Sequence, residues 1–110
     1  MNQAQALKLA RKVGEDFLKN AGTLCESAKP AARRVEALLA DAAELRLQSE
    51  LETNPHLKAS YLQGSETNLR AAKTIALAEG VVASDATAAW LESAARMVLA
   101  TTVTLVKASL

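Results

Sequence analysis

The chain from Asp85 to Leu110 reads D-A-T-A-A-W-L-E-S-A-A-R-M-V-L-A-T-T-V-T-L-V-K-A-S-L, and this stretch decides the predicted fold. It holds the only tryptophan and the densest apolar run of the protein. The β-branched segment 101–106 would also suit a strand, but it continues an alanine-rich pattern without a turn residue. Ser84 is suited to cap a helix, and Asp85 places a negative charge in its first turn. We therefore expect a helix over residues 85–109.

Apolar residues cover an unusually wide part of this helix. At about 100° per residue, one central stripe contains Leu91, Ala94, Val98, Thr101, Thr102 and Leu105. Further apolar residues flank the stripe on both sides, and the polar edge is confined to Glu92, Ser93, Arg96 and Lys107. A surface helix needs an apolar stripe only about 100° wide, and this one is about twice that. Either the helix lies in the middle of a bundle, or another chain covers part of it.

The apolar run of this helix is too short to cross a membrane. Its longest uncharged run, Met97 to Val106, is half of the roughly twenty residues that a membrane span needs, and it contains three threonines. A membrane-surface helix has a basic polar edge, and the polar edge of this helix is not basic. We expect neither a membrane span nor a membrane-surface helix.

Length and composition predict one all-α domain spanning 1–110, which we expect to be a complete small protein. Half of the 110 residues are hydrophobic, 23% are charged, and four glycines with two prolines are too few for the turns of an all-β fold. The net charge of +1 argues against a nucleic-acid partner. The single cysteine excludes an internal disulfide, which favours the cytoplasm.

Turn and cap residues divide the rest of the chain. Gly22 is placed to end a first helix, and Thr23 to Glu26 has the form of a capping box. Asn54 can cap the helix that Pro55 begins, and Gly80 ends it. Short connections make successive helices antiparallel, so the fold class is an up-down-up-down four-helix bundle. The expected helices cover residues 3–21, 30–52, 55–79 and 85–109, with a possible short turn of helix at 24–28.

The helix over 30–52 carries two apolar seams. Its main seam contains Val35, Leu38, Leu39, Ala42 and Leu45. Leu47 and Leu51 lie roughly 120–160° away from Val35. This second seam contacts either the first helix or loop of the same chain, or another copy of the protein. On the next helix, Glu66 and Arg70 have the spacing of an exposed ion pair.

His56 is the only histidine, in the sequence Asn54-Pro55-His56-Leu57-Lys58. A lone histidine with a lysine two positions on, in a four-helix chain of this length, is similar to a histidine phosphotransfer domain. That family follows its histidine with H-x-x-K-G, whereas this chain reads H-L-K-A-S. The resemblance implies His56 as a phosphoacceptor; the alternative is an exposed residue in a first helical turn.

Other residues that could support chemistry are few. Cys25 lies in the proposed capping turn, where a helix N-terminus can make a thiol reactive, or it is a small buried hydrophobe. The sequence contains no Glu-x-x-His motif for a di-metal bundle site and too few Cys and His ligands for zinc. Lys8, Arg11 and Lys12 could join Arg33 and Arg34 in a phosphate-binding patch, although neighbouring carboxylates dilute it. We therefore expect no catalytic residue, metal or cofactor.

The sequence favours a non-enzymatic helical protein that acts by association. The expected partner is the protein itself, as a homo-oligomer, or a helix of another protein, as adaptors and small chaperones bind. The residues expected at the contact are Leu47, Leu51, Val103 and Leu110. Alternatives are phosphotransfer through His56 and a small-ligand pocket inside the bundle, roofed by Trp90, Met97 and Tyr61.

Overall fold

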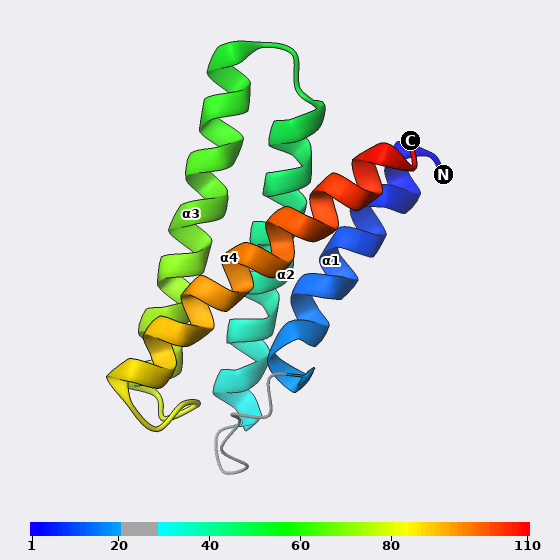
Figure 1. Cartoon of the computed structure of the whole chain (residues 1–110). Coiled ribbons are helices and arrows are strands. Elements are labelled where there is room, and N and C mark those ends of the chain that lie inside the picture. The colour runs from blue at the N-terminus through cyan, green and yellow to red at the C-terminus, as the bar shows by residue number, and fades with distance from the viewer. Residues whose placement is uncertain (21–28) are drawn as a thin grey trace.

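The computed structural model describes residues 1–20 and 29–110, which form four helices (Figure 1). They are α1 (Gln3–Asn20), α2 (Lys29–Leu51), α3 (Pro55–Ala78) and α4 (Asp85–Ala108). Their directions alternate along the chain, so the predicted all-α four-helix bundle is confirmed. Each helix begins and ends within one residue of the predicted bounds. The proposed turn at 24–28, with Gly22, the capping box and Cys25, lies outside the described residues.

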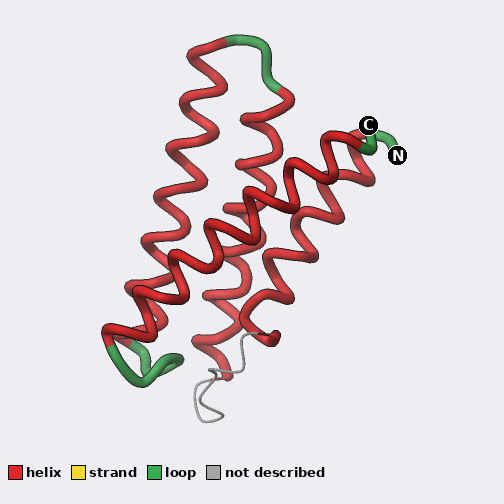
Figure 2. The backbone as a smooth tube through the Cα atoms, in the orientation of Figure 1, coloured by secondary structure: helices red, strands yellow, loops and turns green. Residues whose placement is uncertain are grey.

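Three of the helices form a layer, and the fourth lies across it. Helix α2 contacts α1 on one side and α3 on the other, while α4 contacts all three (Figures 1 and 2). Every residue of α2 from Leu38 to Leu51 is buried or half-buried. The central helix is therefore α2, and the expectation that the last helix could occupy the middle of the bundle is wrong.

The helix ends follow the cap residues seen in the sequence. The Asn54 side chain accepts hydrogen bonds from the backbone N–H groups of His56 (2.9 Å) and Leu57 (3.3 Å), and Pro55 begins α3. Ser84 accepts from the Thr87 N–H at 3.1 Å. Gly80 has a φ of 70°, which a residue without Cβ adopts without strain. The confirmed caps fix where α3 ends and α4 begins.

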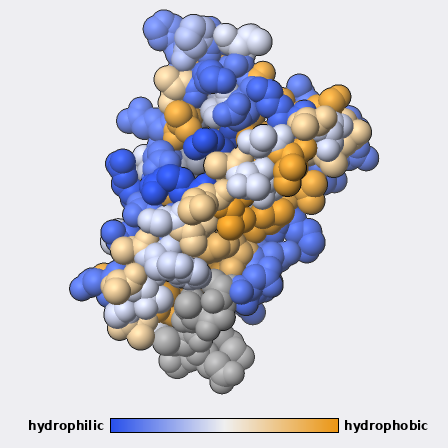
Figure 3. All heavy atoms as spheres, in the orientation of Figure 1, coloured by the Kyte–Doolittle hydropathy of each residue, from blue (hydrophilic) through white to orange (hydrophobic). Residues whose placement is uncertain are grey.

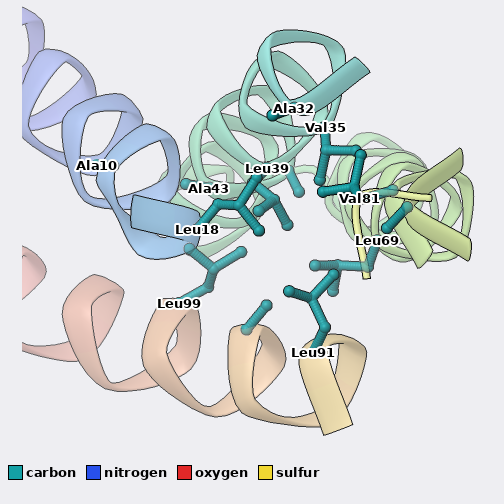
Figure 4. Close-up of a cluster of buried hydrophobic side chains, with 14 of the residues drawn as sticks. Ala10, Leu18, Ala32, Val35, Leu39, Ala43, Leu69, Val81, Leu91 and Leu99 are labelled. Carbon is teal, nitrogen blue, oxygen red and sulfur yellow. The ribbon is translucent and has the colours of Figure 1, made fainter. Parts of the chain in front are cut away.

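The core is built from leucine, valine and alanine of all four helices. Figure 4 shows Leu18 of α1 and Leu39 of α2 above Leu91 and Leu99 of α4, which point toward them. Val81, in the turn after α3, is fully buried and closes one end of this core. The described helices include none that is long and apolar enough to cross a membrane.

Small residues bring α1 close to α2. The buried residues of α1 recur every four positions, as Ala6, Ala10, Gly14 and Leu18. A Cβ atom placed on Gly14 would overlap the carbonyl oxygen of Leu39 and lie 2.8 Å from its carbonyl carbon. The two backbones therefore meet at Gly14, where only glycine fits.

Candidate functional site

Helix α4 is rotated about its axis relative to the stripe predicted from hydropathy. Its buried row is Ala88, Leu91, Ala95, Leu99, Val103 and Val106. The predicted central stripe shares only Leu91 with this row, while Val98, Thr101 and Leu105 are exposed. Apolar residues surround the helix, so hydropathy alone could not select the side that packs inward.

The charged edge of α4 determines the rotation. Arg96 binds Glu66 of α3 through two nitrogens, with Nη2 2.7 Å from Oε2 and Nε 3.0 Å from Oε1. Glu92 lies 3.8 Å from Lys73 of α3. Glu92 and Arg96 therefore face the neighbouring helix instead of solvent. The pair expected between Glu66 and Arg70 is replaced by this contact between helices, which leaves Arg70 only a longer-range Coulombic influence on Glu66.

Electrostatics agree with this geometry. The hydrogen bonds from Arg96 hold the pKa of Glu66 below its ordinary value, against the opposing effect of burial. The same bonds raise the pKa of Arg96. Both groups therefore stay charged at neutral pH and fix α4 against α3.

The opposite side of α4 carries no charge. We call the exposed residues of α4 from Ala86 to Leu105 the outer face, and all of them are alanine, serine, threonine or larger apolar residues. The largest of these residues have high exposed fractions, of 72% for Met97, 65% for Leu105, 47% for Trp90 and 37% for Val98. Hydrophobic side chains gather along the diagonal of α4 in Figure 3. The sequence analysis did not single out the outer face, although the confinement of all charges of α4 to one edge is a signal that could have found it.

A groove runs beside the outer face, between α4 and α1. It has a volume of about 550 Å³ and is lined by Val13, Asp16, Phe17, Asn20, Trp90, Ala94 and Val98. The rings of Phe17 and Trp90 stack with centroids 6.5 Å apart and planes inclined by 28°. Apolar surface thus continues from α4 onto α1.

The predicted contact residues are not together on the surface. Leu47 and Val103 are fully buried in the chain's own core, and Leu51 is half-buried against it. Of the four, only Leu110 is exposed. The second seam of α2 is therefore internal at Leu47, which belongs to the buried core.

The residues considered for chemistry lie apart. His56 is exposed in the first turn of α3, and its backbone N–H serves the Asn54 cap. Trp90 and Met97 face outward, so they do not roof a pocket inside the bundle. Among residues 1–20 and 29–110, no three His, Cys, Asp or Glu side chains are grouped to hold a metal ion.

Three of the five basic residues considered for a phosphate patch are paired with carboxylates. Arg11 binds Asp41 at 2.6 Å and Glu44 at 2.7 Å, Lys12 binds Asp16 at 3.1 Å, and Arg34 binds Glu79. Arg11 and Arg33 line the same hollow, but Glu15 and Glu36 line it too, so carboxylates dilute the positive charge.

Comparison with known proteins finds no matching family model, and neither the curated proteins nor the solved structures show a significant match.

Proposed function

We propose that this chain is a non-enzymatic binding protein that associates through the outer face of α4 and the adjoining groove of α1. The single observation that carries the proposal is the absence of charge from the exposed residues between Ala86 and Leu105. A surface helix ordinarily keeps its solvent side polar. Burying this face would stabilise a complex by about 25 cal/mol for each Å² of apolar surface removed from water.

The surroundings of the face suit an interface. Charged side chains border the outer face at Arg96 and Lys107 on one side and at Asp16 on the other. An apolar centre with a polar rim is the ordinary anatomy of a protein–protein contact. The partner is a second copy or an apolar helix of another protein, and the proposed compartment is the cytoplasm.

A matched pair of surface variants tests the proposal. Met97→Glu places a charge in the centre of the outer face, and Leu57→Glu places the same charge on an exposed apolar residue in the first turn of α3. Both variants should keep the helical circular dichroism of the wild type, because neither side chain is in the core. Light scattering reports self-association, and immobilised chain reports capture of other proteins from an extract.

We expect the wild type and Leu57→Glu to associate equally and Met97→Glu to lose the association. If Met97→Glu keeps both the molar mass and every captured protein of the wild type, the outer face is not a binding surface.

A second candidate is small-ligand binding in the groove between α1 and α4. Its volume of about 550 Å³ and the stacked Phe17 and Trp90 rings favour this function, since ligand sites usually measure 300–1,000 Å³. Nile red, a neutral apolar dye, should bind the wild type and lose affinity with Phe17→Ala. Equal affinity of the wild type and Phe17→Ala for the dye would show that the groove is not a ligand site.

A further inference from the structure

We propose that the occupant of the outer face is a second copy of this chain, with the two α4 helices packed antiparallel about a two-fold axis. This inference rests on the proposed function and narrows the partner to the protein itself. Three properties of α4 support it: the spacing of its outward residues, their sizes and the direction of its helix dipole.

The outward residues of α4 repeat with the spacing of a helix–helix seam. Steps of four and three alternate along the positions Trp90, Ala94, Met97, Thr101, Thr104 and Ala108. This is the repeat with which two helices pack side by side, and it points away from the buried row of α4. The bundle therefore leaves a complete seam without a partner helix among the described residues.

The sizes of these residues fit an antiparallel copy. When two such seams run in opposite directions about a midpoint near Leu99, Met97 faces Thr101 of the second copy. By the same register, Trp90 faces Ala108 and Ala94 faces Thr104. No layer then pairs two large residues. Parallel packing would place Trp90 on Trp90 and Ala94 on Ala94, which alternates overfilled and empty layers, and close-packed interfaces exclude both.

The direction of the helix dipoles also favours antiparallel packing. Glu92, Arg96 and Lys107 are paired with charged residues of α2 and α3 in the same chain. These charges therefore stay outside the seam and do not oppose a second copy. Two α4 helices that run in opposite directions oppose their dipoles favourably.

The available area is sufficient. Helix α4 has 24 residues, which corresponds to about 36 Å of length at 1.5 Å per residue. The apolar strip extends onto α1 through Leu9, Val13 and Phe17. Two neighbouring helices present a strip roughly 20 Å wide, hence ~700 Å² per copy, close to the ~800 Å² per partner of a stable interface.

A charge-exchange experiment tests the partner and its direction together. In the proposed register, Met97→Glu on one copy faces Thr101→Lys on the other. Each variant alone buries an unpaired charge twice in the dimer, which should raise the dissociation constant at least ~100-fold. An equimolar mixture of the two should recover a dimer by light scattering, with reductant present throughout. Ala108→Lys is the matched control, since it lies on the same seam about two turns from the position that faces Met97→Glu.

Recovery with Thr101→Lys but not with Ala108→Lys is the expected result. Equal recovery with both variants, or with neither, overturns the register. A wild type that remains monomeric across a tenfold range of concentration overturns the second copy as occupant. If Met97→Glu nevertheless loses a captured protein, the proposed function stands without this inference; if Met97→Glu changes nothing, both fail.

Discussion

Arg96 of α4 donates two hydrogen bonds to Glu66 of α3, from Nη2 to Oε2 at 2.7 Å and from Nε to Oε1 at 3.0 Å. This contact joins residues 30 positions apart in the sequence. It turns the charged edge of α4 toward α3, and the uncharged outer face is consequently left on the surface. The exposed Trp90 and Met97 are thus a consequence of where the arginine binds.

The Arg96–Glu66 pair should contribute stability that acid removes. Arg96 lowers the pKa of Glu66 in the folded chain below its ordinary value of 4.5. The folded state therefore binds fewer protons than the unfolded state just below pH 4.5, so the contribution is present above that pH and is lost as pH falls. In urea unfolding, Glu66→Gln should be less stable than wild type by about 0.5–1 kcal/mol at neutral pH, and this difference should shrink toward pH 3.

The exposed Glu15 supplies the control for this titration, since its carboxylate makes no ion pair with a described residue. Glu15→Gln should follow the wild-type pH dependence. A constant difference between Glu66→Gln and wild type from neutral pH into acid would contradict the role assigned to the pair.

A methyl side chain should destabilise the protein at position 14 but not at position 64. A Cβ on Gly14 meets the backbone of Leu39 and Ala40, which cannot move without separating α1 from α2. Gly14→Ala should lower the free energy of unfolding by about 1–3 kcal/mol. A Cβ on Gly64 meets only the Leu45 side chain, at 3.2 Å. Because Leu45 can shift, Gly64→Ala should raise stability by up to about 1 kcal/mol. Denaturant unfolding measures both, and equal effects would be inconsistent with the close approach at Gly14.

Truncation of Leu47 to alanine should lower the stability of the fold far more than truncation of Met97. Leu47 is fully buried, so Leu47→Ala leaves a cavity and should cost about 2–5 kcal/mol. Met97 is 72% exposed, so Met97→Ala should change the stability of the monomer by less than about 0.5 kcal/mol. Denaturant unfolding at low protein concentration, where association is weak, provides the comparison. A small loss of unfolding free energy for Leu47→Ala would contradict the burial of Leu47 and support its predicted role as a surface contact.

Association should be visible in the fluorescence of Trp90, the only tryptophan. Trp90 is 47% exposed on the outer face, so covering this face removes it from water. Its emission maximum should move to shorter wavelength as protein concentration rises. The emission of Met97→Glu should not depend on concentration; a parallel shift in that variant would place the covered surface elsewhere.

The sequence was sufficient for the elements of the fold because their signals are local. Asn54, Pro55 and Ser84 cap or begin helices within a few residues of themselves, and the structure confirms each of them. Gly80 likewise ends α3 by its own conformational freedom. Interactions of this range are readable without knowledge of the tertiary structure.

The orientation of the helices could not be read in the same way. The inward side of α4 depends on Glu66, which lies on another helix, and nothing near Arg96 in sequence identifies that partner. The burial of Leu47 likewise depends on the helices that cover α2. The positions of Trp90 and Met97 on the surface follow from these tertiary contacts, so the sequence alone could not place them.

The most direct test of the account is the molar mass of the wild type by light scattering over a tenfold range of concentration, beside Met97→Glu. The account predicts that the wild-type mass rises toward twice the 11.6 kDa of one chain, while Met97→Glu stays at the mass of one chain. A wild-type mass of 11.6 kDa at every concentration would contradict the pairing of α4 with a second copy.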